Sequence, residues 1–288
     1  MPTNKQRRVA AQRRLQRQLE RRAELARKRR RTVLVVVTVL AVVLVGGAVS
    51  LAAGFGGGDD PDTTEAATSS SAASTGGDDA GPTAAPAVTN ADGTVTCTYA
   101  PDTSGNPNLT DVGTPPDPAA TPASGTVSLL MSTDQGDIPL TLDRGRAPCA
   151  AASFAHLATQ RFFDGSPCHR EVNQPEFGVL QCGDPTGTGS GGPSYTYAEE
   201  VTPETTYPRG TIAMANSGQP GSTGSQFFLC FVDTQLPPDY TAVGTVDEAG
   251  LAVLDTIAAA GNDGSFEPSP GGGAPNLPVT IQTMTVTG

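Results

Sequence analysis

The sequence predicts a mainly β domain over residues 125–288, built as a closed antiparallel barrel capped by two α-helices and preceded by a single transmembrane helix. Three observations predict it. Short segments of alternating apolar and polar residues, separated by turns rich in Gly and Pro, are typical of an antiparallel barrel. Two further segments carry apolar residues at helical spacing. An uncharged apolar run of 21 residues precedes all of them.

Charge divides the chain into two unequal parts. Thirteen of the 18 Lys and Arg residues lie within the first 31 residues, against two acidic residues, so this tail has a net charge of +11. The remaining 257 residues hold five Arg, 27 acidic residues and no Lys, for a net charge of −22. A body without Lys excludes Schiff-base and P-loop lysine chemistry. Its negative charge argues against nucleic acid as a partner, and two His residues in the whole chain argue against a His-rich metal site.

The apolar run at residues 33–53 reads VLVVVTVLAVVLVGGAVSLAA and would be about 32 Å long as a helix, which is one bilayer core. By the positive-inside rule, residues 1–32 form a basic cytoplasmic tail and the rest of the chain is exported. A cleaved signal peptide is the alternative, because small residues follow the run. Since the charged region is long and the run exceeds the usual 7–15 residues, we expect an uncleaved single-pass anchor in the cell membrane.

A low-complexity segment follows the anchor. Residues 54–94 consist almost entirely of Gly, Ala, Ser, Thr, Asp and Pro, too little apolar surface for a folded core, so they are expected to be a disordered linker. Residues 95–124 form a Pro-rich extension with a few larger residues, Val95, Cys97, Tyr99 and Leu109, that can pack on the next domain. The remaining residues, 125–288, are expected to form one domain.

Periodicity predicts the elements of this domain in order. Apolar residues alternate over 127–131 and 138–142 on either side of a turn at 134–136, which predicts a β-hairpin. Helical spacing predicts helices over 147–160 and over 251–260, the second closed by Gly261. Alternation over 279–286 predicts a terminal strand.

Five Cys residues in an exported domain predict disulfides and one leftover thiol. Cys168 and Cys182 flank a loop between two short strands and are the expected pair. Cys97 and Cys149 are a weaker second pair, and Cys230, within an apolar run, is expected to be a buried free thiol. None of these pairs has the C-x-x-C spacing, which argues against redox catalysis and zinc.

Two other motifs lack the context that their chemistry needs. Gly187–Gly192 matches G-x-G-x-x-G, but Pro193 follows it, so no helix begins there to bind a phosphate, and we expect a flexible loop. A serine hydrolase would need a nucleophile motif that is absent and would depend on His169 as its base. His156 lies within the first helix and is expected to be structural.

Four runs mix a few polar donors with apolar residues: Phe162–Arg170, Val179–Asp184, Thr211–Gly218 and Gly224–Cys230. Such residues predict a site for an uncharged, partly apolar ligand. The runs resemble the cyclophilin-type peptidyl-prolyl isomerases, whose F-x-x-x-x-F-H-R, Q-x-G-D, M-A-N-A-G and G-S-Q-F-F signatures appear in order as CHR, QCGD, MANSG and GSQFF. The resemblance covers residues 125–288. With its basic tail and predicted anchor, the whole chain is similar to membrane-anchored actinobacterial members of the family. The resemblance implies an eight-stranded barrel with two helices.

The resemblance also implies an activity, the cis-trans isomerisation of X–Pro bonds in exported proteins, without a covalent step. Arg170 matches the catalytic arginine that stabilises the twisted amide, and Gln181 matches the residue that hydrogen-bonds the substrate and orients it. Phe228 is expected at the floor of the proline pocket, and Phe227 in the barrel core. The expected substrate-binding residues are His169, Phe177, Val179, Ala215, Asn216, Gln226, Leu236 and Tyr240. His169 is expected to act as a neutral hydrogen-bonding group.

This chain departs from the family pattern at the rim. About three residues are added between His169 and Gln181, and a family Phe corresponds to Gly178, with Phe177 beside it, which leaves open which ring closes the pocket. The frequent Trp is absent, and Tyr240 replaces a pocket-wall His. The expected partners are proline-containing polypeptides and, through the anchor, the membrane; we expect a monomer with no cofactor and no metal. The alternative function is a non-catalytic peptide-binding or chaperone module that uses the same groove.

Overall fold

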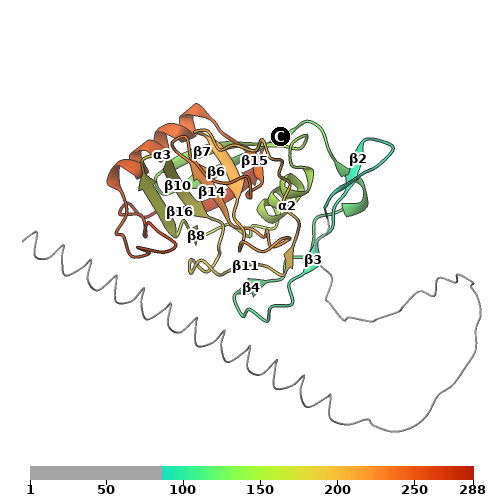
Figure 1. The fold of residues 1–288 in the computed structure, drawn as a ribbon, viewed down its shortest axis with the longest axis horizontal. Helices are drawn as coiled ribbons and strands as arrows, with labels where there is room; N and C mark the ends of the chain where they lie inside the picture. Colours follow the sequence, from blue (N-terminus) through green and yellow to red (C-terminus); the bar gives the residue numbers. More distant parts are fainter. Residues whose placement is uncertain (1–85) are drawn as a thin grey trace, which may run out of the picture. The chain divides into compact units, whose positions relative to one another are not determined.

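The structure, a computed structural model, describes residues 86–288. Its main feature is one antiparallel sheet that curls around an apolar interior, with strand order β8-β16-β6-β7-β15-β13-β14-β10-β9 (Figure 1). The strands are β6 (Thr126–Thr133), β7 (Gly136–Asp143), β8 (Ser166–Pro167), β9 (Arg170–Gln174), β10 (Phe177–Cys182), β13 (Thr211–Met214), β14 (Phe227–Cys230), β15 (Ala242–Val246) and β16 (Thr280–Val286).

The sheet has nine strands where eight were expected, because residues 168–169 interrupt one run of chain and divide it into β8 and β9. Ser166 and Pro167 pair with β16, the next two residues lie outside both ladders, and pairing with β10 begins at Arg170. One run of chain, 166–174, therefore supplies both edge strands. Within residues 86–288 no ladder joins β8 to β9. The mainly β class with two helices is confirmed, and closure of the barrel stays a prediction.

The predicted hairpin and terminal strand are confirmed as β6, β7 and β16. In the hairpin, Leu129 pairs with Leu140 and Met131 with Ile138, and each of these four side chains is at most 2% exposed. The residues between them on β6 and β7 are only partly buried. Alternation along each strand thus places one face of the hairpin in the core.

Both predicted helices are confirmed, as α2 (Pro148–Thr159) and α3 (Glu248–Ala260). Helix α3 ends at Gly261, as expected, but begins three residues before the predicted start at Leu251. The apolar periodicity did not predict the first turn, because that turn contains Glu248 and Gly250. Gly250 packs so closely on the hairpin that an added Cβ would lie 2.8 Å from the side chain of Ile138.

The Pro-rich extension packs on the sheet domain at three places. A disulfide joins Cys97 to Cys149 of α2, with their Cα atoms 5.5 Å apart. Strand β3 (Ala100–Pro101) pairs with β12 (Tyr195–Thr196), and β4 (Leu109–Thr110) pairs in parallel with β11 (Gly192–Pro193). The extension is therefore fixed both to a helix and to the loop that follows β10.

Ordered structure begins earlier than expected, within the segment predicted as disordered linker up to residue 94. Strands β1 (Val88–Thr89), β2 (Thr94–Thr96) and β5 (Thr121–Pro122) form a small sheet, beside a 3₁₀ helix η1 (Pro118–Ala120). The predicted linker is therefore ordered from β1 onward, and Asn90 gives the physical reason. Its side chain donates to Thr94 Oγ1 at 2.8 Å and to the Ala119 carbonyl at 2.9 Å, so a polar turn stabilises what composition alone predicts as unfolded.

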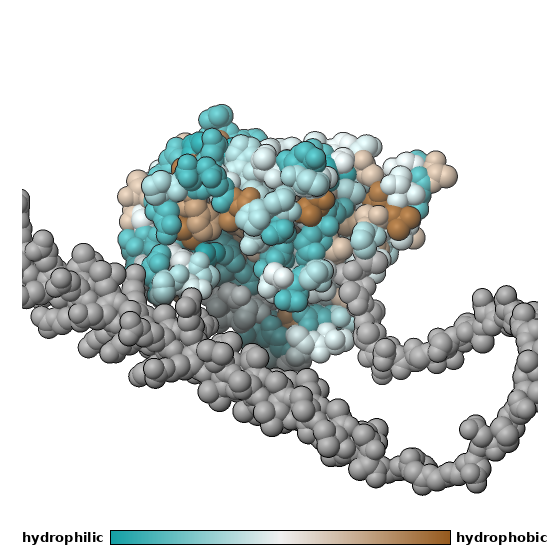
Figure 2. Space-filling model, in the orientation of Figure 1, coloured by the Kyte–Doolittle hydropathy of each residue, from teal (hydrophilic) through white to brown (hydrophobic). Residues whose placement is uncertain are grey.

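Aromatic side chains fill the interior between α2 and the sheet. The ring of Phe154 lies 5.1 Å from that of Phe163 and 4.9 Å from that of Phe227, and all three side chains are inaccessible to solvent. The face in Figure 2 is mainly hydrophilic with isolated apolar spots. Large exposed apolar residues in the described part are limited to Val88, Val201 and Val286. Phe227 thus belongs to the core, as expected.

The predicted tail (1–32), anchor (33–53) and first part of the linker lie outside the described residues. Between residues 86 and 288, neither helix has the length and apolar character needed to cross a bilayer.

We predict that the double substitution Cys97→Ala and Cys149→Ala lowers the free energy of unfolding by about 4 kcal/mol. The disulfide closes a loop with a sequence separation of 52, and its removal restores conformational entropy to the unfolded chain. Urea unfolding of the oxidised protein and the double variant measures the difference. Equal midpoints, or a Cys97 that reacts with an alkylating reagent under non-reducing conditions, would contradict the pairing.

Candidate active site

Residues far apart in the sequence surround one pocket of about 600 Å³. Ten of the eleven side chains expected at the site line it: His169, Arg170, Phe177, Val179, Gln181, Ala215, Asn216, Phe228, Leu236 and Tyr240. The eleventh, Gln226, lines an adjoining pocket and accepts a hydrogen bond from Gln181 at 3.0 Å. The structure thus brings the expected set together at one place.

Strand register arranges the central residues in one row. Arg170 of β9 lies opposite Gln181 of β10, Gln181 lies opposite Phe228 of β14, and Phe228 lies opposite Ala213 of β13. Residues directly opposite each other in neighbouring strands project to the same face of a sheet. The paired strands therefore place the cation, the amide and the aromatic ring on one face of the sheet.

The Arg170 guanidinium is fixed by three hydrogen bonds. Nη1 donates to Gln181 Oε1, Nε to the Gly271 carbonyl and Nη2 to the Pro270 carbonyl, each at 2.9 Å. A guanidinium has five N–H donors and stays protonated in proteins, so two donors remain for a ligand. Arg170 is half-buried, and this burial lowers its pKa from the ordinary value.

An apolar floor lies beside this cation. Val179 and Phe228 are 2% and 5% exposed, and the Tyr240 ring packs edge-on against Phe228 with centroids 5.5 Å apart. Tyr207, which the sequence reasoning did not single out, packs beneath them, and its hydroxyl donates to the Tyr240 carbonyl at 2.9 Å. The floor is thus a rigid aromatic surface large enough for a small ring.

The ring that closes the pocket is Phe177. Its side chain lines the pocket, whereas the position of a Cβ at Gly178 is on the other face of the strand. A Cβ at Gly178 would lie 2.5 Å from the Phe231 ring and 2.6 Å from the Val232 side chain. No larger residue fits at position 178, so the aromatic side chain stands one residue earlier.

His169 lines the pocket as a neutral group. Its side chain is 9% exposed, and Nδ1 is buried without a hydrogen-bond partner. Burial lowers the pKa of His169, with the Asp184 carboxylate acting in the opposite direction. Because its pKa lies below the ordinary value of 6.5, His169 is largely uncharged at pH 7, and its hydrogen-bonding role stays a prediction.

Two loops contribute residues that the sequence reasoning missed. Phe266 and Pro270 line the pocket from the loop between α3 and β16, and the same loop supplies both carbonyls that hold Arg170. Thr188 and Gly189 line it from the loop after β10. Backbone carbonyls carry no sequence signal of their own, and the Gly- and Pro-rich composition of residues 264–275 is typical of a connecting loop.

The G-x-G-x-x-G segment is held in place, in contrast to the flexible loop expected. The Asp184 side chain is fully buried and accepts hydrogen bonds from the backbone N–H of Thr186 at 2.7 Å and of Gly189 at 2.6 Å. Burial is the largest single influence on the pKa of Asp184 and raises it, but hydrogen bonds from the Thr186 hydroxyl and from the backbone N–H of Gly191, Thr186 and Gly189 together lower it. A buried carboxylate therefore fixes the wall of the pocket.

The cysteines are arranged as the sequence predicts. Cys168 is bonded to Cys182, Cys97 to Cys149, and Cys230 is a buried free thiol. Burial raises the pKa of Cys230 to about 12, so this thiol is unreactive at neutral pH. The Cys168–Cys182 bond lies next to the pocket, because Cys182 follows Gln181 directly.

One buried acid adjoins the site. Glu171 is inaccessible to solvent, Oε2 has no hydrogen-bond partner, and Oε1 accepts from Asn173 at 3.4 Å. Burial raises the pKa of Glu171 from 4.5 to about 7. This carboxyl is therefore partly protonated near neutral pH.

The pocket combines a fixed cation that has free N–H donors with a dry aromatic floor. Such a site can bind an uncharged group with an acceptor atom next to an apolar ring. Within residues 86–288, no cluster of His, Cys, Asp and Glu has the arrangement of a metal site.

Comparisons with known proteins agree with this geometry. The family model described as cyclophilin type peptidyl-prolyl cis-trans isomerase/CLD matches residues 128–286. The probable peptidyl-prolyl cis-trans isomerases B of Mycobacterium tuberculosis and of Mycobacterium leprae are each 45% identical to the chain, over 145 and 144 residues. The crystal structure of a cyclophilin type peptidyl-prolyl cis-trans isomerase of Cryptosporidium parvum is 26% identical with a TM-score of 0.50.

These matches cover different shares of the proteins. The similarity to the two mycobacterial relatives covers 46% of this chain and 44% and 47% of their own lengths, so the chain spans less than half of either. The match to the Cryptosporidium structure covers 57% of this chain and 99% of that one.

We predict that Glu171→Gln raises the free energy of unfolding relative to wild type by about 3 kcal/mol more at pH 8 than at pH 4. Between pH 4.5 and about 7 the folded state holds a proton on Glu171 that the unfolded state releases. The free energy of unfolding therefore falls as the pH rises through this range, at about 1.4 kcal/mol per pKa unit. Thermal unfolding from pH 4 to pH 8 measures it, with the exposed Glu204→Gln as control. A Glu171→Gln curve parallel to wild type would contradict the prediction.

Proposed function

Because the chain belongs to the cyclophilin-type peptidyl-prolyl cis-trans isomerase family, we propose that it catalyses the cis-trans isomerisation of X–Pro bonds in polypeptides. The observation that carries the proposal is the Arg170 guanidinium, hydrogen-bonded to Gln181 at 2.9 Å beside the aromatic floor of Phe228. A cation with two free donors and an apolar ring pocket are the two parts that this reaction needs.

The chemistry requires stabilisation of a twisted amide. Rotation about the X–Pro bond breaks amide resonance, with a barrier of about 18–20 kcal/mol, and localises a lone pair on the proline nitrogen. A catalyst must bind this twisted state better than either planar form. An N–H of Arg170 directed at that nitrogen, or at the neighbouring carbonyl, supplies the stabilisation without a covalent step.

Preorganisation makes the arginine effective. Three of its five donors are occupied by Gln181 and by the carbonyls of Pro270 and Gly271, so the two free donors have a fixed direction. The guanidinium therefore needs little rearrangement when the amide twists. A flexible arginine in water would lose much of this electrostatic advantage.

The other residues have binding roles. Phe228 and Val179 form the floor for the proline ring, and Phe177, Leu236 and Tyr240 form its walls. Ala215, Asn216 and Gln226 line the path of the peptide, Gln181 orients Arg170, and His169 offers a neutral ring nitrogen. The Cys168–Cys182 bond holds the strands that carry Arg170 and Gln181.

We also propose that the curled sheet closes as a barrel. Support comes from the single run of residues 166–174, which supplies both edge strands, and from the bridge between Glu171 and Gly273 that covers this seam. Closure would place the row of Arg170, Gln181 and Phe228 on a rigid surface.

The cellular setting is proposed from the sequence. The basic tail and the 21-residue apolar run favour a single-pass anchor in the cell membrane with the isomerase domain outside, where exported chains fold. The two disulfides of the described part agree with an oxidising compartment.

We predict that Arg170→Ala lowers kcat/KM for isomerisation of a proline-containing peptide at least about 100-fold, the usual effect of removing a preorganised donor. The exposed Arg146→Ala is the matched control and keeps wild-type activity. A protease-coupled or NMR exchange assay measures the rates. If wild type binds the peptide but leaves the uncatalysed rate unchanged, the non-catalytic peptide-binding function replaces this one. Equal rates for wild type and Arg170→Ala would contradict the role of the arginine.

We predict that the full chain fractionates with membranes and stays there after an alkaline carbonate wash. A span of 21 apolar residues is buried in the bilayer, whereas a tail bound only by charge is released. Immunoblots of the membrane and soluble fractions measure this. Recovery of the isomerase domain in the medium, with a new N-terminus near Ala53, would establish cleavage instead.

A further inference from the structure

A second pocket, of about 390 Å³, adjoins the first. The two pockets share Gln181, Gly189, Ala215 and Asn216 as lining residues, so they are parts of one groove. An extended peptide advances about 3.3 Å per residue. A peptide whose proline occupies the first pocket therefore reaches the second within a few residues.

The extension builds the outer wall of this second pocket. Asp102, Asn106 and Leu109 line it, and all three lie before residue 128, where the match to the family begins. The wall is firmly held. Asn106 Nδ2 donates to the Ser190 carbonyl at 2.7 Å. Strands β4 and β3 pair with β11 and β12, which follow Ser190 in the chain. This chain thus adds its own surface to the groove.

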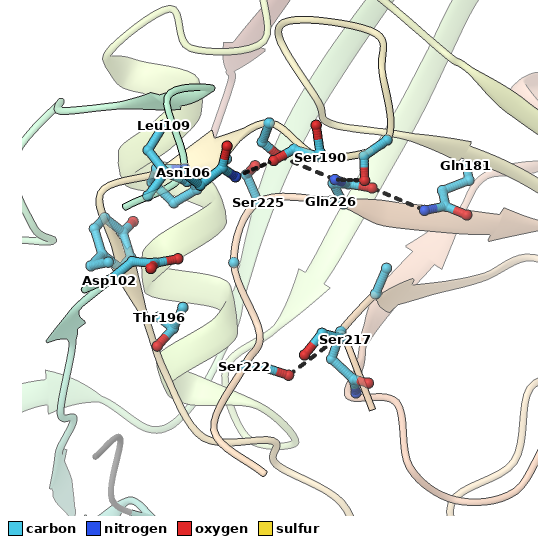
Figure 3. A pocket seen from close by; sticks show the side chains of 18 residues that line it. Asp102, Asn106, Leu109, Gln181, Ser190, Thr196, Ser217, Ser222, Ser225 and Gln226 are labelled. Atoms are coloured by element: carbon cyan, nitrogen blue, oxygen red, sulfur yellow. Dashed lines mark hydrogen bonds between the residues drawn. The ribbon is translucent and has the colours of Figure 1, made fainter. Parts of the chain in front are cut away.

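A hydrogen-bonded chain connects this wall to the first pocket. Asn106 donates to Ser190 O, Gln226 Nε2 donates to the carbonyls of Gly189 and Gly191 at 3.0 and 3.1 Å, and Gln181 donates to Gln226 (Figure 3). The two pockets are therefore held in a defined relation, and Asp102 and Gln181 lie at opposite ends of the second (Figure 3).

The charge of the second pocket is negative. Asp102 is the one charged residue that lines it, and its side chain is half-buried. Oδ1 accepts the backbone N–H of Ser104 at 2.8 Å, which orients the carboxylate. Behind Ser222, another lining residue, the Glu199 carboxylate accepts the Ser222 N–H at 3.2 Å and adds to the negative potential. No Lys or Arg balances these acids in the lining.

We propose that the second pocket binds a basic side chain, Lys or Arg, of the same peptide whose proline occupies the first pocket, with Asp102 as its ionic partner. The inference rests on the proposed isomerase function and names the substrate class of that site. Leu109, Gly191 and Gly192 contact the aliphatic part of such a side chain, and the polar rim receives its charged end. Segment 100–110 is thus a specificity element.

A positional scan tests this proposal. Peptides with one X–Pro bond carry Lys, its neutral analogue norleucine, or Glu at each position within four residues of the proline, and kcat/KM is measured at low salt with the full chain in detergent. At one position Lys is expected to exceed norleucine about twofold to fivefold, with Glu below both, as for a half-exposed ion pair. The preference falls as the salt concentration rises.

Two variants assign the effect to the pocket. Asp102→Asn keeps the acceptor for the Ser104 N–H but removes the charge, so the ratio of Lys to norleucine falls towards one. Asp117→Asn, an exposed acid of the same extension outside the pocket, keeps the wild-type ratio. If the norleucine peptides are isomerised and no position shows a Lys preference, or if Asp102→Asn leaves that preference intact, this inference is wrong and the isomerase function stands. If no peptide is isomerised, both fail.

Discussion

Antiparallel pairing of β9 with β10 sets the geometry on which the rest of the site depends. It places Arg170 opposite Gln181, and the pairing of β10 with β14 adds Phe228 to the same row. Because side chains alternate between faces along a strand, a slip of one residue would turn the guanidinium away from the floor. The Cys168–Cys182 bond joins the same two segments beside this pair and opposes such a slip.

The residues that line the groove include few charges, and the positive and the negative charge are separated. Among the residues that line the two pockets, Arg170 is the one cation and Asp102 the one acid, and they belong to different pockets. A cation beside the aromatic floor suits a carbonyl and a nitrogen lone pair, whereas an acid at the far end suits a basic side chain. The groove therefore has a polarity along its length, and the extension contributes to it.

Local patterns sufficed for much of the fold. Alternation along β6, β7 and β16 and the apolar spacing of α2 depend on neighbouring residues, so these elements were predictable. Motif resemblance brought together ten of the residues that line one pocket. It left undecided whether position 177 or 178 carries the closing ring, because the answer depends on Phe231, which lies against Gly178 from the bend that follows β14. The start of ordered structure at β1 was missed because its hydrogen bonds come from Asn90 in a polar turn.

The sequence by itself determined which functional groups this protein has: one arginine in a recognisable motif, a glutamine and a phenylalanine at matching positions, and five cysteines. Only the tertiary structure decided how they are used. Arg170 is held by the carbonyl of Gly271, 101 residues away along the chain, and the outer wall of the second pocket comes from residues before the sheet domain. Burial and backbone partners depend on distances between remote segments, and no local pattern of residues encodes those distances.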